Sequence, residues 1–147
     1  MATTINWVSG TTTLANTDYV TAGSPTSVII GSGWVTIGAS AFNNTSIQSV
    51  VIADSVTTLD TASFQGCTSL TSVTFSASSQ LTTIGASAFA YNGTSGFTTF
   101  AVPDTVTSIG DNSFRDAKTL TSFTFGDNSQ LTTIGDSAFA WATLTTI

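Results

Sequence analysis

The stretch Leu120–Ala140 (LTSFTFGDNSQLTTIGDSAFA) decides the fold, because Leu70–Ala90 (LTSVTFSASSQLTTIGASAFA) nearly repeats it 50 residues earlier. About three quarters of the aligned positions are identical. Self-similarity at a fixed distance indicates that one supersecondary unit has been stacked several times. We therefore expect weaker copies of the same unit elsewhere in the chain.

A six-residue marker, Ile-Gly-x-x-Ala-Phe, identifies these other copies. Its aromatic position is occupied by Tyr19, Phe42, Phe64, Phe89, Phe114 and Phe139. These positions lie 22 to 25 residues apart, a period inside the range of leucine-rich repeats. The Gly of the marker permits a sharp corner, so we expect a short helical or 3₁₀ turn that places Ala and Phe in the core.

A pair of apolar residues at strand spacing precedes each marker. The pairs are Ile5/Trp7, Val28/Ile30, Val50/Ile52, Val73/Phe75, Phe100/Val102 and Phe123/Phe125. Apolar residues that alternate with polar ones predict a short, half-buried strand. The chain is therefore predicted to be mostly β with short helical turns, a leucine-rich-repeat-like solenoid of six turns of about 22–27 residues each. The solenoid forms one domain over residues 1–147, with turns starting near 4, 27, 49, 72, 99 and 122 and a seventh beginning at 144.

Two segments carry a resemblance to a known family. Ser63–Leu70 (SFQGCTSL) and Thr105–Gly110 (TVTSIG) are similar to the corner and the second segment of the BspA-type leucine-rich repeat. The resemblance implies an extracellular or cell-surface protein of a bacterium or protist, often an adhesin that binds host or matrix proteins. Cys67 keeps the corner cysteine of that family, and Thr45, Ala117 and Ala142 lie near the equivalent place. We expect Cys67 to pack in the core.

The charge balance excludes several classes of partner. Only 7% of the residues are charged, the net charge is −6, and Arg115 and Lys118 are the two basic residues. A nucleic-acid partner requires basic charge to release phosphate counterions, so none is predicted. No apolar run approaches the length of about 18 residues that a transmembrane helix needs, so no membrane insertion is predicted.

The same composition predicts no enzyme. The chain has no His, no carboxylate pair at a framed spacing, and a single cysteine, so neither a catalytic site, a metal site nor a cofactor is expected. Asp111 and Asp136 occupy the same position in adjacent turns and could hold a cation. We favour two solvated carboxylates beside the free N–H groups of each turn.

Threonine pairs precede the marker in most turns, including Thr57-Thr58, Thr82-Thr83 and Thr132-Thr133. Stacking would align them into columns of hydroxyl groups. Such columns resemble the Thr arrays of ice-binding proteins, whereas the simpler interpretation is a ladder of cross-strand Thr pairs that stabilises the surface.

The two ends of the solenoid suggest the main functional hypothesis, because neither has an evident polar cap. Ile147 is expected at the first inward strand position of a new turn, in register with Phe123. Head-to-tail stacking would then give an open extracellular filament, through the residues Ile5, Trp7, Leu14, Phe123, Phe125, Phe139 and Ile147. The alternative is a surface adhesin module that binds host or matrix proteins through the outward strand residues and a protruding loop containing Tyr91, Asn92 and Phe97.

Overall fold

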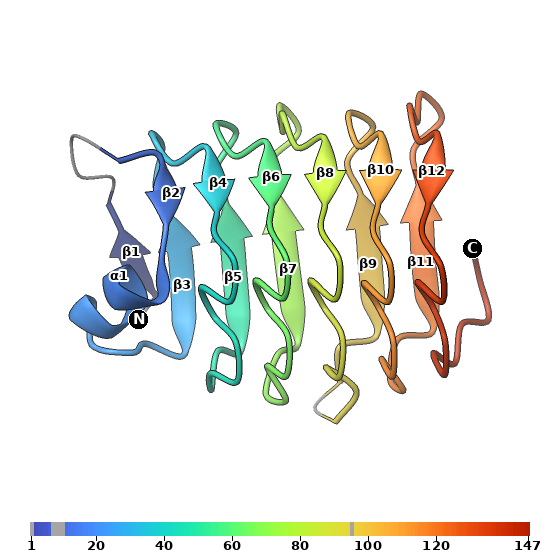
Figure 1. Ribbon diagram of the computed structural model, residues 1–147, viewed down its shortest axis with the longest axis horizontal. Coiled ribbons are helices and arrows are strands. Elements are labelled where there is room, and N and C mark those ends of the chain that lie inside the picture. The colour runs from blue at the N-terminus through green and yellow to red at the C-terminus, as the bar shows by residue number, and fades with distance from the viewer. Residues whose placement is uncertain (1, 7–10, 95) are drawn as a thin grey trace.

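The computed structural model describes residues 2–6, 11–94 and 96–147, which form a stack of similar coils running from left to right in Figure 1. Each coil runs from a long strand through a short strand to a corner and back. The long strands are β1 (Thr3–Ile5), β3 (Ser27–Ile30), β5 (Ser49–Ile52), β7 (Ser72–Phe75), β9 (Thr99–Val102) and β11 (Ser122–Phe125). The short strands are β2 (Thr13–Leu14), β4 (Thr36–Ile37), β6 (Thr58–Leu59), β8 (Thr83–Ile84), β10 (Ser108–Ile109) and β12 (Thr133–Ile134).

All pairing between coils is parallel, and its register confirms the repeat alignment with one exception. In the first coil Ile5 pairs with Ile30, and Thr3 pairs with Val28. The inward pair of that coil is therefore Thr3/Ile5, so the predicted Ile5/Trp7 was wrong by two residues, and Trp7 lies outside the described residues. At the other end Ser122 bridges to Thr146, which places Ile147 opposite Phe123 as predicted.

A column of aromatic rings forms the centre of the core. Phe42, Phe64, Phe89, Phe114 and Phe139 stack with centroid separations of 4.9, 5.3, 5.3 and 5.5 Å. These are the marker aromatics, so the prediction that they enter the core is confirmed. Offset stacking at such distances adds to the hydrophobic gain from burying each ring. A coil cannot bury this face alone, and the neighbouring coils supply the cover.

The corner after each short strand differs between the first coil and the later ones. The first coil forms α1 (Asn16–Thr21), the predicted helical turn. In later coils the corner is a run of tight turns in which two columns of residues adopt positive φ. The first column, Ser40, Ala62, Ser87, Asn112 and Ser137, has φ of 55–57°. The second column, Asn44, Gly66, Tyr91, Asp116 and Trp141, has φ of 55–67°.

Left-handed residues at every fourth position prevent a helix because they reverse its backbone sense. They also turn alternate N–H groups toward the next coil: the Phe42 N–H donates to the Ser63 carbonyl at 2.8 Å, while the Ala41 N–H donates to Gly38 at 3.1 Å. The corners therefore add a third line of hydrogen bonds between coils, beside the two sheets.

Candidate functional site

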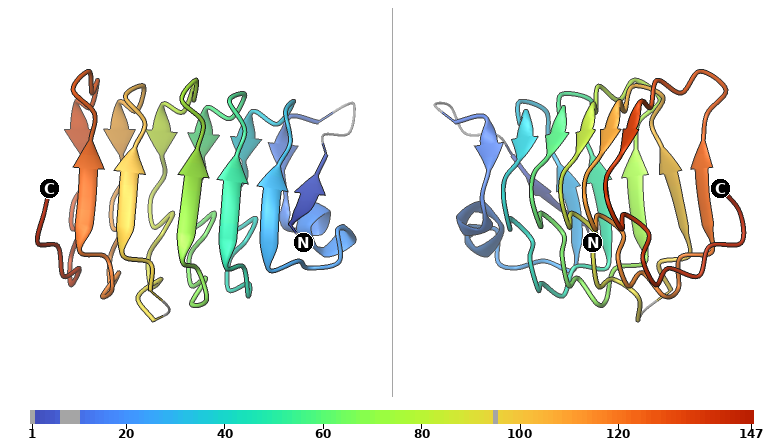
Figure 2. Two further views of the ribbon diagram at one scale, coloured as in Figure 1. Left: turned by 180° about the vertical axis from the view of Figure 1, so that it is seen from behind. Right: turned by 45° about the vertical axis from the view of Figure 1, so that its right-hand side comes forward.

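The long-strand face is divided at one place. Strands β1, β3, β5 and β7 form one sheet and β9 pairs only with β11, whereas the short strands form one continuous six-stranded sheet. Within the described residues no strand pairing joins β7 to β9. Figure 2 shows these two strands standing further apart than their neighbours. We call the surface cavity between these two strands the β7–β9 cleft.

An exchange of large and small core residues accounts for the division. The two inward positions hold Val73 and Phe75 in β7 but Phe100 and Val102 in β9. The rings of Phe75 and Phe100 therefore meet diagonally, edge to face, with centroids 5.7 Å apart. Phe100 stacks normally on Phe123 at 5.5 Å, because β11 has Phe at the same position. Strands β9 and β11, which both have Phe at the first inward position, therefore pair closely again.

The β7–β9 cleft is a cavity of about 280 Å³, lined by Val73, Thr74, Phe75, Ser76, Ala101, Val102 and Pro103. Val73 and Phe75 are only half-buried, although the equivalent Val50 and Ile52 of the preceding coil are fully buried. The cleft therefore opens a path from solvent to core side chains. Its edges also present backbone N–H and C=O groups that no strand covers.

Two exposed apolar side chains lie on the outer face of β3 and β5, on the β7 side of the cleft. Ile29 and Val51 both point outward from β3 and β5, lie opposite each other in register, and are exposed. Exposed apolar side chains that adjoin one another are a feature of interaction surfaces. The outward positions next in line are Thr74 and Ala101, which border the cleft itself.

The predicted ligand loop is mostly not available to a ligand. Tyr91 is exposed, but Asn92 and Phe97 are buried. The Asn92 Nδ2 donates to the Phe64 carbonyl at 2.9 Å, and the Phe97 ring packs 6.0 Å from that of Phe89. The repeat itself carried this signal, since Asn92 follows the marker Phe89 by three residues, as Cys67 follows Phe64.

Cys67 packs in the core, as expected. Its Sγ donates to the Phe42 carbonyl at 3.0 Å and lies 3.5 Å from the Thr45 hydroxyl. Burial is the main cause that raises the pKa of the Cys67 thiol, and the Thr45 hydrogen bond partly opposes it. A buried, protonated thiol is a poor nucleophile, so this residue is structural.

The residues predicted for head-to-tail contact fall into two groups. Ile5, Leu14 and Phe123 are buried within the chain. Phe125 and Phe139 are half-buried, and Ile147 is 71% exposed. The buried members are already covered by their own chain and cannot contact a second copy without rearrangement.

The Thr column is a hydrogen-bonded ladder. The Oγ1 of Thr82 donates to the Thr57 carbonyl at 3.1 Å, that of Thr107 to Thr82 at 3.2 Å, and that of Thr132 to Thr107 at 3.0 Å. Each hydroxyl proton is therefore directed at the preceding coil. This bonding accounts for the column, and ice binding stays an untested hypothesis.

Asp111 uses one carboxylate oxygen within the fold. Its Oδ1 accepts the Asp136 N–H at 2.8 Å, so this carboxylate binds a backbone N–H at the corner of the next coil. Across the described residues no group of three or more His, Cys, Asp or Glu side chains gathers as a metal site. No helix in the described part of the chain is long and apolar enough to cross a membrane.

Comparisons with known proteins agree with this architecture. Residues 2–99 and 90–147 match the BspA type leucine-rich-repeat region, in six copies. A leucine-rich repeat protein from Bacteroides ovatus is 30% identical with a TM-score of 0.66, over 78% of this chain and 28% of that one. A leucine-rich cell surface protein from Faecalibacterium prausnitzii is 24% identical with a TM-score of 0.60, over 74% of this chain and 31% of that one. No curated protein matches.

The aligned region is thus less than a third of the length of either solved protein. A third structure, the pneumococcal vaccine antigen PcpA, shares the fold at 17% identity and a TM-score of 0.58. The repeat match extends over nearly the whole chain. This chain belongs to the BspA-type leucine-rich-repeat family.

Proposed function

We propose that this chain is a protein-binding module displayed outside the cell, and that it receives an apolar side chain of its partner in the β7–β9 cleft. The observation that carries the proposal is the partial exposure of Val73 and Phe75. Both occupy the inward strand positions that Val50 and Ile52 fill, fully buried, in the preceding coil. The surface location is supported by the description of the Faecalibacterium relative as a cell surface protein.

The chemistry of the cleft favours an extended polypeptide segment. Apolar side chains line its floor, and two strand edges without partners border it. A peptide lying along these edges gains main-chain hydrogen bonds, while alternate side chains enter the cleft or face solvent. The exposed Ile29 and Val51 extend the apolar surface along the neighbouring strands.

The test is selection from a random peptide display library with the wild-type chain. We expect selected peptides to share an apolar residue. Ala101→Trp, which fills the mouth of the cleft, should abolish their binding. The matched control is Thr124→Trp, at the exposed position of β11 that pairs with Ala101 and does not line the cleft. Equal binding by Ala101→Trp, or the absence of any selected peptide, would contradict the proposal.

Head-to-tail assembly into a filament is a second proposal, favoured by the exposure of apolar side chains in the last coil. Ile147 is 71% exposed. Ile134 is 49% exposed, although Ile109, the equivalent residue of the preceding coil, is buried. A further coil from a second copy would cover them. Ile5 and Leu14 are buried, so the first coil would need a different contact surface.

Sedimentation velocity at rising protein concentration tests this assembly. We expect polymers for the wild type and monomers for Ile147→Asp or Phe125→Lys, with Val51→Lys as a control charge on the sheet face. A wild type that stays monomeric at every concentration would rule out self-assembly by this chain.

A further inference from the structure

The corners of the last three coils carry the exposed aromatic side chains of the described chain. Tyr91 is 44% exposed and Trp141 is 65% exposed, whereas the phenylalanine rings lie in or against the core. Both residues belong to the second positive-φ column, with φ of 63° and 61°. The same column holds Asn44, Gly66 and Asp116 in the other coils, and these residue types adopt a left-handed backbone more readily.

Two bulky aromatic residues in this backbone conformation are unexpected from stability alone. Left-handed geometry at a non-glycine residue is strained, and such strain concentrates at functional sites. The fold would be better served by Gly, as at Gly66, or by Asn, as at Asn44. The presence of exposed rings at two strained positions therefore points to a role for the rings themselves.

Backbone contacts hold the two aromatic residues on one surface. The Tyr91 N–H donates to the Arg115 carbonyl at 2.8 Å, and the Asp116 N–H donates to the Ala140 carbonyl at 2.8 Å. Tyr91, Asp116 and Trp141 thus occupy three successive coils, so the two aromatic positions stand about 10 Å apart along the stack. That separation suits a short chain of linked sugar rings.

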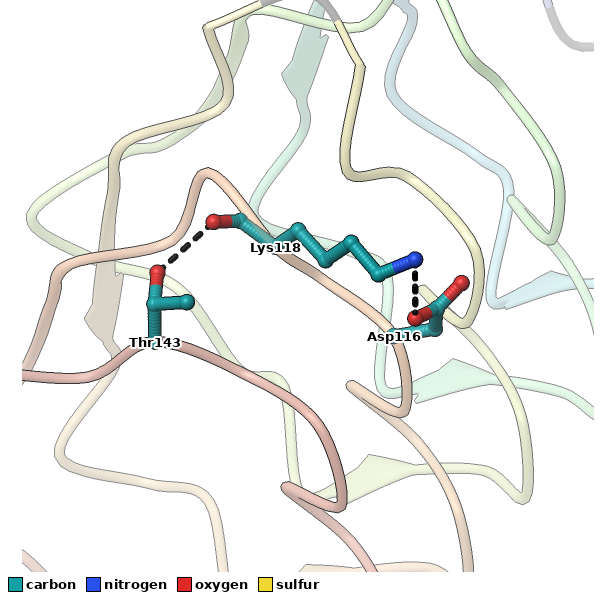
Figure 3. Close-up of polar contacts among 3 residues, drawn as sticks. All are labelled: Asp116, Lys118 and Thr143. Atoms are coloured by element: carbon teal, nitrogen blue, oxygen red, sulfur yellow. Dashed lines mark hydrogen bonds and ion pairs between the residues drawn. The ribbon is translucent and has the colours of Figure 1, made fainter.

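The two basic residues of the chain lie on the same surface, although the net charge is −6. The Arg115 guanidinium lies over the Trp141 ring, 4.2 Å from its centroid, and Nη1 donates to Asn112 at 3.1 Å. The Arg115 Nε is buried with no hydrogen-bond partner in the protein. Lys118 extends to Asp116 at 3.0 Å, and its carbonyl accepts the Thr143 hydroxyl at 2.7 Å (Figure 3).

We propose that this aromatic corner, formed by Tyr91, Arg115, Asp116, Lys118 and Trp141, binds an acidic oligosaccharide built of uronic acid units. The aromatic rings offer rigid apolar platforms for the C–H faces of sugar rings. Arg115 and Lys118 supply charge-assisted hydrogen bonds to the sugar carboxylates. Asp116 accepts hydrogen bonds from sugar hydroxyls. The site is separate from the β7–β9 cleft and takes a different class of ligand.

The decisive variants replace each aromatic residue by glycine. Trp141→Gly and Tyr91→Gly remove the ring and also relieve the left-handed strain, so both proteins should fold at least as well as the wild type. Their binding should nevertheless fall by about tenfold or more. Ser137→Gly, in the other positive-φ column, makes the same backbone change without removing a ring and is the matched control.

The probes are oligogalacturonate, alginate and hyaluronan fragments, titrated into the whole chain by calorimetry. A neutral galacto-oligosaccharide and poly-glutamate serve as comparisons. We expect at least one uronic acid fragment to bind, Arg115→Gln to weaken it, and higher salt to weaken it further. Failure of every fragment to bind the wild type overturns the proposal, as does unchanged binding by Trp141→Gly. Equal binding of the neutral sugar overturns its acidic character, and equal binding of poly-glutamate overturns its saccharide character.

Discussion

Three different side chains at the corners of successive coils donate to the carbonyl of a marker phenylalanine. Thr45 donates to the carbonyl of its own coil, whereas Cys67 and Asn92 donate to that of the preceding coil. Thr45 Oγ1 donates to the Phe42 carbonyl at 2.9 Å, and Cys67 Sγ donates to the same carbonyl at 3.0 Å. Asn92 Nδ2 donates to the Phe64 carbonyl at 2.9 Å. A buried carbonyl without a partner costs more than the hydrogen bond is worth. The residue type can therefore vary while the donor is kept.

Asn92→Ala should lower the free energy of unfolding by about 1–3 kcal/mol, because it leaves the buried Phe64 carbonyl without this donor. Denaturation by urea measures the change. Asn128→Ala, at an exposed position with no hydrogen bond of its side chain described, is the control and should change stability little. Equal effects of the two substitutions would show that the corner donor is dispensable.

Cys67 should make stability depend on pH in the alkaline range. Burial raises its pKa in the folded state above the unfolded value of about 8.5. The folded chain thus holds the thiol proton more tightly than the unfolded chain, and this difference adds to the free energy of unfolding. The added stability is fully present below about pH 8.5 and is lost as the pH rises through the pKa of the folded state. The stability difference between wild type and Cys67→Ala should shrink as pH rises from 7 to 10. Since burial also raises the pKa of Tyr19, the difference isolates the cysteine.

At the scale of elements, the corner is built from left-handed residues that are mostly not glycine. Ala62 has φ of 56° and no polar side chain to compensate. Steric contact of the alanine Cβ in this left-handed conformation destabilises the folded state by about 1–2 kcal/mol. Glycine would remove that contact, but it would also lower the free energy of unfolding by about 0.4–1 kcal/mol because the unfolded chain gains conformational entropy.

Ala62→Gly is therefore expected to stabilise the protein by about 0.5–1 kcal/mol. Thermal unfolding followed by circular dichroism measures the change in Tm. Ala53→Gly, at a position without positive φ, should destabilise the protein instead. A lower Tm for Ala62→Gly would mean that this corner is not strained.

The β7–β9 cleft should also be visible in solution. Strands β3 and β5 have partners on both sides, whereas β7 and β9 each have one. Amides that face the cleft lack a strand acceptor and are exposed to water. Hydrogen exchange followed by NMR should show faster exchange for alternate amides of β7 and β9 than for β5. Uniform protection across these strands would mean that the cleft closes in solution.

At the scale of the whole molecule, stability comes from contacts between neighbouring coils, and surface charge is sparse. Stacked aromatic rings, two parallel sheets and the hydrogen-bonded corners all join adjacent coils. The low charge limits repulsion between copies of the chain. The acidic side chains nevertheless determine how the protein behaves as pH falls.

Solubility should pass through a minimum near pH 4.1, the isoelectric point of the sequence. Above this pH the net charge of the chain is negative and below it the net charge is positive, so electrostatic repulsion between molecules vanishes in between. Light scattering across pH 3 to 7 measures the effect. Constant scattering over this range would indicate that hydrophobic contacts, not charge, control association.

The repeat period, the inward strand pairs and the buried marker aromatics were determined by the sequence alone, because each copy places the same residue type in the same environment. The family and the packing of Cys67 followed from the same pattern. Prediction was weakest where a copy departs from the others. The inward pair of the first coil was misplaced by two residues, and Asn92 and Phe97 were taken for a loop although they occupy repeat positions.

Only the tertiary structure decided what lies between coils. The β7–β9 cleft depends on how Val73 and Phe75 meet Phe100 and Val102 across two strands, a relation that no single repeat contains. The aromatic corner likewise arises because Tyr91, Arg115 and Trp141 come from three coils. A stacked repeat specifies each coil locally. Mismatch and surface sites depend instead on pairs of side chains that meet only when the coils are assembled.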